Sequence, residues 1–182
     1  MFREDRATAA AWKFVSLHGG AIPHKKLMKL LYFADRAWLI ERGMTLFEDN
    51  FCSMDEGPVL STTYNRMKDP SRGFDVGDIW RKVLSPIRNE TIHKKADLDP
   101  SQFLTRSQLA LLDAIWSQYG GMSVEEIVNE AHQLPEWTDP KGSSIFIQYR
   151  TVLEKELESQ QEVISKTRSV MTQRRISAAF GG

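Results

Sequence analysis

The sequence predicts a mainly α (α+β) protein: a compact multi-helix domain with a small β-hairpin and an extended C-terminal helix or tail. Apolar residues recur at steps of three and four along most of the chain, which is typical of helices with one buried face. Gly-Gly pairs at 19–20 and 120–121 end two of these segments. Strand patterns compete with helical ones mainly at 74–98.

The first two helices are expected before Gly43. Apolar residues from Ala7 to His18 follow one helical face and stop at the first Gly-Gly pair. The second helix follows Pro23 and ends at Gly43. Its first turns carry three lysines that oppose the helix dipole, so packing must stabilise this helix. These lysines are Lys25, Lys26 and Lys29.

The middle of the chain carries weaker patterns. We expect a loop at 45–54 with an extended segment at Phe51–Met54, and then a short helix that starts at Pro58 and reaches Met67. Within 74–98, one short strand through Ile79 to Leu84 and another at Thr91–His93 flank a turn. This section therefore predicts the small hairpin.

Capping patterns predict helices in the second half of the chain. Two helices, ending near Tyr119 and His132, each begin with a capping box. The two boxes pair Thr105 with Gln108 and Ser123 with Glu126. A last helix is expected to start at Ser143 or Ser144 and to pass through Val152 and Leu157.

The C-terminal segment carries a step in charge. From Ile164 to Gly182 there are four basic residues and no acidic one, and they are Lys166, Arg168, Arg174 and Arg175. A solvated helix that frays at its end is the simpler interpretation, and an arm ordered by a partner protein or nucleic acid is the alternative. We expect one domain at 1–150 and an amphipathic helix with a basic tail at 151–182.

Composition narrows the functional classes. The 182 residues include 24 Lys and Arg and 24 Asp and Glu, so no net charge attracts nucleic acid or an anionic membrane. No apolar run approaches the roughly 20 residues of a membrane span. A single cysteine, Cys52, cannot form an intrachain disulfide or a multi-cysteine zinc site. We therefore expect a cytoplasmic protein without membrane contact.

Residues with catalytic potential form no recognisable constellation. The four histidines lie far apart in the sequence, so no local metal-binding pair exists, and they are His18, His24, His93 and His132. Asp55 and Glu56 could act in acid–base chemistry, but a turn and a favourable charge at a helix N-terminus explain them as well. We expect no catalytic residue, no metal and no cofactor.

Two blocks of residues resemble a known family. The first is Lys29-Leu30-Leu31-Tyr32-Phe33-Ala34, followed by Trp38, Phe51, the turn Glu56-Gly57-Pro58-Val59 and Tyr64. The second is Tyr119-Gly120, the Ser123-capped helix, Ala131-His132-Gln133 and Trp137. In order and spacing, over about residues 7 to 150, they resemble the Panacea domain, also called the SocA-like or GepA-like phage-associated domain.

The resemblance implies an antitoxin. Members of this family neutralise small toxins by direct protein contact, and at least one type delivers its toxin to an energy-dependent protease. The implied partners are a cognate toxin and such a protease. The candidate partner-binding residues are Asp55, Glu56, Gly57, Pro58, Tyr64, His132 and Trp137.

This chain departs from the family pattern at two places. Asp55-Glu56 replaces the basic-aromatic pair that often precedes the turn, and Leu134-Pro135-Glu136 is inserted before Trp137. These departures fit a binding surface that changes with its toxin.

Two other functions stay open. Residues 105–132 could form a helix-turn-helix with the 74–98 hairpin as a wing, although Glu125, Glu126 and Glu130 would then face DNA phosphates. A hydrolase using His132, Asp55 and Glu56 is the third alternative. Nucleic acid is expected to bind, if at all, through the basic tail.

The DNA-binding alternative can be tested by measuring the affinity of the protein for duplex DNA. Because the net charge is zero and the candidate recognition helix is acidic, the folded domain without residues 164–182 should bind random duplex DNA no more tightly than about micromolar at physiological salt. Titration with labelled duplex at several salt concentrations measures this affinity. Tight binding that falls steeply with salt would support the regulator.

Overall fold

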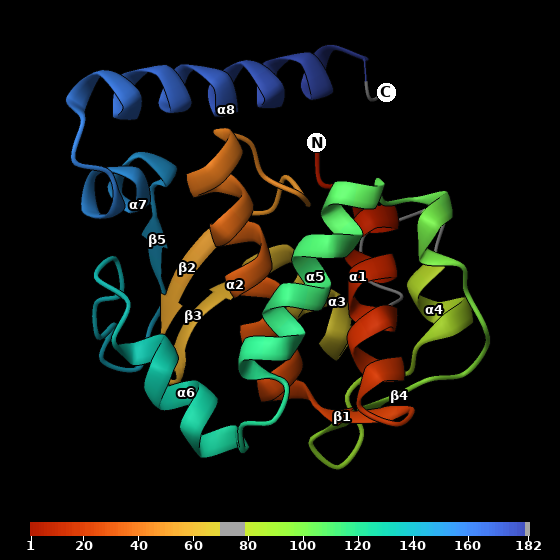
Figure 1. Cartoon of the computed structure of the whole chain (residues 1–182). Coiled ribbons are helices and arrows are strands. Elements are labelled where there is room, and N and C mark those ends of the chain that lie inside the picture. Colours follow the sequence, from red (N-terminus) through yellow and green to blue (C-terminus); the bar gives the residue numbers. More distant parts are fainter. Residues whose placement is uncertain (70–78, 181–182) are drawn as a thin grey trace.

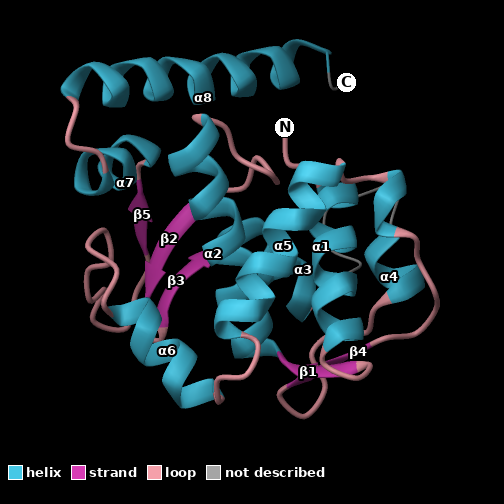
Figure 2. Ribbon diagram, in the orientation of Figure 1, coloured by secondary structure: helices cyan, strands magenta, loops and turns pink. Residues whose placement is uncertain are grey.

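The computed structural model, which describes residues 1–69 and 79–180, confirms the mainly helical class with a small amount of β-structure (Figure 1). Figure 2 shows the short strands lying between the helices. The elements are α1 Glu4–Leu17, β1 Ala21–Pro23, α2 His24–Arg42, β2 Phe51–Met54, β3 Gly57–Leu60, α3 Ser61–Lys68, α4 Ile79–Val83, β4 Thr91–His93, the 3₁₀ turn η1 Pro100–Gln102, α5 Arg106–Tyr119, α6 Val124–His132, β5 Ile145–Ile147, α7 Tyr149–Glu156 and α8 Gln160–Phe180.

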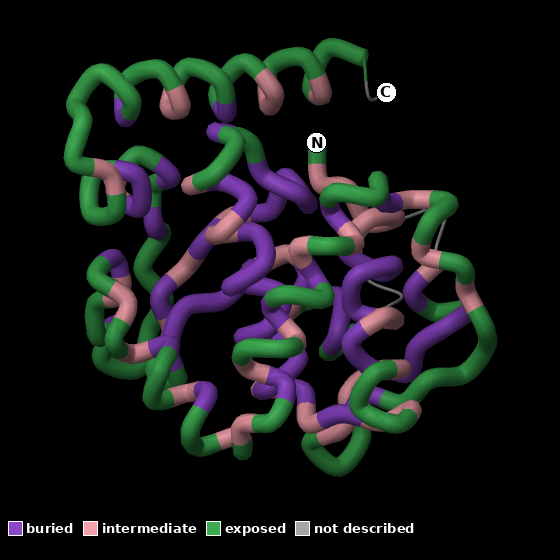
Figure 3. The backbone as a smooth tube through the Cα atoms, viewed as in Figure 1, coloured by how far each residue is buried: buried purple, intermediate pink, exposed green. Residues whose placement is uncertain are grey.

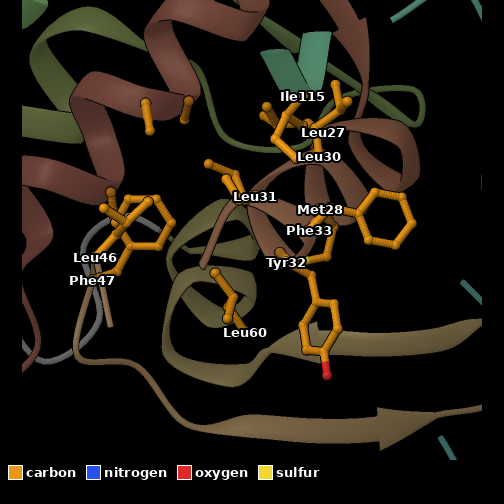
Figure 4. Close-up of a cluster of buried hydrophobic side chains, with 14 of the residues drawn as sticks. Leu27, Met28, Leu30, Leu31, Tyr32, Phe33, Leu46, Phe47, Leu60 and Ile115 are labelled. Atoms are coloured by element: carbon orange, nitrogen blue, oxygen red, sulfur yellow. The ribbon is translucent and has the colours of Figure 1, made fainter. Parts of the chain in front are cut away.

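Helix α2 forms the centre of the molecule. It packs against α1, α5, α6, α7, α8, β1 and β3. Figure 3 shows the buried backbone concentrated around it, and Figure 4 shows its Leu27, Leu31 and Phe33 within the surrounding apolar cluster. Even its early lysines Lys26 and Lys29 are buried. Packing on all sides thus stabilises a helix whose first turns oppose its own dipole.

The described strands form two small antiparallel sheets. In the first, β1 pairs with β4, so that Ile22 lies opposite Ile92. In the second, β2 lies between β3 and β5, and Ser53 faces Pro58 on one side and Ile145 on the other. The second sheet thus ties the middle of the chain to the segment after α6.

The hairpin predicted for 74–98 is wrong in its first strand. Ile79–Val83 is helical, and Trp80 and Val83 share its buried side, because a spacing of three residues fits a helix as well as a strand. The second strand is confirmed at Thr91–His93, but its partner is the distant β1. Single bridges, Leu84 with Lys94 and Arg88 with Thr91, close the loop between them. Residues 74–78 lie outside the described residues.

The helix predicted to start at Pro58 begins instead at Ser61, because Pro58 lies in strand β3. The side chain of Asp49 accepts hydrogen bonds from the backbone amides of Thr62 and Thr63, at 2.8 and 2.7 Å. A buried carboxylate from the loop before β2 therefore binds amides at the N-terminus of α3 that no bond within the helix can satisfy.

The helix predicted to start at Ser143 or Ser144 is also displaced. Residues Ile145–Ile147 form the edge strand β5, and helix α7 begins only at Tyr149. The apolar run here is only three residues long, and the partner strand β2 lies about 90 positions earlier in the chain. The local sequence therefore gives no sign of the strand.

Helix α8 crosses one end of the molecule (Figure 1) and extends through Phe180. Polar contacts attach it to the body: Lys166 Nζ donates to the carbonyl oxygen of Ile40, and Gln173 exchanges hydrogen bonds with Thr45. The division of the chain at residue 150 stays a prediction. Among the described residues, no helix combines the length and apolar character that spanning a membrane requires.

One buried carboxyl lies beside the loop that follows α2. Asp35 is fully buried; its Oδ1 accepts a hydrogen bond from the Leu46 amide at 2.5 Å, while Oδ2 has no hydrogen-bond partner among the described residues. Burial raises the pKa of Asp35 to about 8, and the nearby charge of Asp49 adds to this effect. The folded protein therefore holds a proton that the unfolded chain releases near pH 4.

This proton makes stability depend on pH. The folded-state pKa of Asp35 lies above its value in the unfolded chain. The contribution of this group to the free energy of unfolding is therefore complete at low pH and is lost as pH rises toward 8. Relative to wild type, Asp35→Asn should gain about 1.4 kcal/mol in unfolding free energy per pH unit between about pH 5 and 7. Urea unfolding at these two pH values measures the gain, and a constant difference would contradict it.

Candidate functional site

The candidate site is built on the tight turn between β2 and β3. Met54 pairs with Gly57, and Asp55 and Glu56 are exposed at the tip. Gly57 has a φ of 94°, which side-chain-bearing residues rarely adopt. A Cβ built there would lie 3.2 Å from both Ala131 Cβ and Lys29 Nζ. Glycine is therefore required both by the conformation and by the close approach of α6 and α2.

A buried lysine holds the turn from the side of α2. Lys29 is 2% exposed, and its Nζ donates to the carbonyl oxygen of Pro58 at 2.9 Å. Burial lowers the pKa of Lys29 to about 7, although the charge of Glu56 acts in the opposite direction. Proline can donate no backbone hydrogen bond, but its carbonyl still needs a partner, and the buried ammonium group supplies one.

A cavity of about 320 Å³ opens beside the turn. Lys29 lies in its wall together with Met28 and Val59, while Lys25 Nζ binds Glu56 Oε1 at 2.5 Å. The remaining lining residues are His24, Met54, Asp55, Gly57 and Tyr64. The cavity thus combines an apolar wall with two lysines and two carboxylates.

His132 and Trp137 support the turn from the side of α6. Their rings pack against each other with centroids 4.3 Å apart and planes inclined by 37°. His132 Nε2 lies 3.0 Å from the carbonyl oxygen of Asp55 and therefore donates to it, and Trp137 Nε1 donates to the carbonyl oxygen of Met54 at 3.0 Å. Both side chains are half-buried. These two side chains therefore supply hydrogen-bond donors to the Asp55 and Met54 carbonyl oxygens of the turn.

The inserted segment before Trp137 supplies a buried carboxylate. Glu136 accepts two hydrogen bonds from Arg36, at 2.7 and 3.1 Å, and one from the hydroxyl of Tyr32 at 2.9 Å. Its side chain is fully buried, and a bidentate arginine is the partner that suits such a group. Glu136 therefore anchors the segment after α6 to α2.

The structure brings the predicted partner-binding residues to one place but divides them in two groups. Asp55 and Glu56 are exposed and Tyr64 is half-buried, and all three line the cavity. The other four lie beneath or behind the turn and contact the chain's own backbone or neighbouring helices, although Gly57 also lines the cavity. They are Gly57, Pro58, His132 and Trp137.

The sequence prediction omitted the cavity lysines. Lys25 and Lys29 contact the turn, yet the sequence drew attention to both as charges unfavourable to their helix, and to Lys29 also as the first residue of a family-like block, but to neither as a site residue. Their unfavourable position in the first turns of the helix was the feature of the sequence that indicated a need for partners. Charged residues in the first turns of an apolar helix need a partner, and here the partners come from the β2–β3 turn.

The hydrolase constellation does not assemble. His132 contacts the backbone oxygen of Asp55, the Asp55 carboxylate accepts from the Gly142 amide at 2.8 Å, and Glu56 pairs with Lys25. The three side chains thus make separate contacts. Among the described residues, no group of three or more His, Cys, Asp or Glu side chains could hold a metal ion.

The helix-turn-helix alternative lacks its wing in the described residues, because β4 pairs with β1 instead of a neighbouring strand. Helix α6, the proposed recognition helix, packs on α2 and β3 and exposes Glu125, Glu126 and Glu130. These carboxylates would repel DNA phosphates.

Fold and site together define a mainly helical protein with a cavity of apolar and charged lining beside a β-turn that hydrogen bonds hold from two sides. Comparison with family models matches residues 27–138 to the antitoxin SocA-like, Panacea domain, and the chain belongs to this family. The match includes the β2–β3 turn, α6 and Trp137, and it confirms the resemblance seen in the sequence. Neither the curated proteins nor the solved structures contain a match.

Two substitutions distinguish the stability cost of the close packing around Gly57 from the cost of its backbone conformation. Gly142→Ala adds a methyl group at a φ of 81° with no atom within 4 Å, so it should cost about 1 to 2 kcal/mol for backbone strain alone. Gly57→Ala should cost at least about 1 kcal/mol more, because Ala131 and Lys29 must move. Chemical denaturation of both variants measures the difference, and equal losses would contradict the tight packing.

Proposed function

We propose that this protein is an antitoxin that neutralises a cognate toxin by direct binding through the cavity side of the β2–β3 turn. Family membership supports the antitoxin role. The binding surface comprises Asp55, Glu56 and Tyr64 with the cavity between them. The toxin contacts these side chains, while His132 and Trp137 position the turn.

The observation that carries the proposal is the support given to the exposed turn. Lys29 binds its Pro58 carbonyl from one side, and His132 and Trp137 bind the Asp55 and Met54 carbonyls from the other. A surface held in its bound conformation loses little freedom when a partner docks, which favours affinity. Tyr64 adds an aromatic ring of the type that contributes strongly at protein interfaces.

Delivery of the toxin to an energy-dependent protease is the second part of the proposal, and the family resemblance is its support. An adaptor holds two proteins at once. It therefore needs a surface for the protease that toxin binding leaves free.

Toxin rescue tests the proposal. The toxin is sought as a small neighbouring open reading frame that stops growth when expressed alone. Co-expression of this protein should restore growth, and Tyr64→Ala combined with Glu56→Ala should abolish the rescue. Loss of about 2 kcal/mol at an interface aromatic alone weakens a complex by more than about tenfold.

A matched control makes the result specific. Tyr119→Ala with Glu125→Ala also removes a half-buried tyrosine and an exposed glutamate, but outside the cavity lining, and it should keep the rescue. Melting temperatures show whether each variant is folded. Full rescue by the Tyr64 and Glu56 variant would remove the turn from the toxin interface.

Trp137 should behave differently from Tyr64. Trp137→Ala removes the ring packed against His132 and leaves the Met54 carbonyl without its donor, so it should cost about 1 to 3 kcal/mol of stability and lower the melting temperature. Loss of toxin rescue by Trp137→Ala should therefore be accompanied by a lower melting temperature. Lost rescue at an unchanged melting temperature would instead make Trp137 a direct contact.

A further inference from the structure

Helix α8 is attached to the body by very few apolar contacts. Of its 21 residues, only Val163 and Val170 are buried. Figure 3 shows the rest of the helix as exposed or intermediate along its whole length. Most helices in globular proteins are stabilised by burying a broad apolar face. Helix α8 therefore buries much less apolar surface against the body than most helices do.

A large groove lies between α8 and the rest of the molecule. Its volume is about 1400 Å³, and its walls are α8, the start of α1 and the end of α2 with the loop that follows. Met44, Ile164 and Ile176 line it and are exposed. The groove shares no lining residue with the cavity beside the β2–β3 turn. It is therefore a separate surface.

Arginines dominate the charges of the groove. Arg6 and Arg168 line it without an ion pair to any described residue, and Arg3 and Arg42 pair with acids close in sequence. Arg6 Nε is buried and has no hydrogen-bond partner among the described residues. Glu48 is the one acid in the described lining, and the N-terminal amine of Met1 neutralises it at 3.1 Å. The groove is therefore positively charged between apolar patches.

We propose that this groove binds an amphipathic helix of a partner protein, with its apolar face on Met44, Ile164 and Ile176 and glutamates or aspartates along its edges. Helix α8 is about 30 Å long at 1.5 Å per residue, so the groove offers a helix-sized track. An acidic edge satisfies Arg6 and Arg168, and an apolar face covers the exposed side chains.

A second copy of this chain is a poor occupant. Its own α8 carries four basic residues against Glu162, and these are Lys166, Arg168, Arg174 and Arg175. Two such helices would bring like charges together. Nucleic acid would satisfy the arginines but would leave the apolar side chains between them without a partner.

Binding of a designed peptide to the full chain tests the proposal. The probe is a labelled helical peptide of about 18 residues with a leucine stripe flanked by glutamates, and its counterpart carries glutamine at every glutamate position. Fluorescence anisotropy at physiological salt should show the acidic peptide binding at least about tenfold more tightly. Arg6→Gln with Arg168→Gln should remove this preference.

A charge-matched control completes the experiment. Arg150→Gln with Arg175→Gln removes the same two charges from exposed positions outside the groove and should keep the preference. Melting curves verify that each variant is folded. Equal binding of the two peptides, or an equal loss in the control variant, would overturn the proposal. Tighter binding of a duplex of about 20 base pairs, or a stable dimer in light scattering, would also overturn it.

Discussion

The architecture depends on the need to give the buried basic side chains of helix α2 a partner. Lys26 donates to the Gly120 carbonyl, Lys29 to the Pro58 carbonyl, and Arg36 to Glu136. Each partner belongs to a different segment around the helix. An unpaired buried charge costs far more than an ordinary lost contact, so these bonds fix where the α5–α6 junction, the β2–β3 turn and the segment after α6 can lie.

The candidate site follows from this constraint. The β2–β3 turn is short and carries a glycine at positive φ, so alone it would be a mobile loop tip. Lys29, His132 and Trp137 each bind one of its carbonyl oxygens. The result is an exposed, charged tip whose backbone is held by hydrogen bonds from two sides, an arrangement that suits protein recognition.

The sequence predicted the features that depend on nearby residues. Both capping boxes form as expected, because their bonds join residues three positions apart. Local patterns missed two features that join residues far apart in the sequence. These are the strand pairing of Ile22 with Ile92 and the capping of α3 by Asp49. The candidate site residues came from the family resemblance, whereas the contact of Lys29 with Pro58 becomes visible only in the folded structure.

Hydrogen exchange measured by mass spectrometry on Lys29→Met and Lys26→Met tests whether the buried lysines hold the surrounding elements. Lys29→Met should accelerate exchange in residues 54–60 and leave the α5–α6 junction protected, because only the Pro58 carbonyl loses its donor. Lys26→Met should do the reverse around Gly120. A uniform increase over the chain, or an unchanged turn in Lys29→Met, would contradict this account.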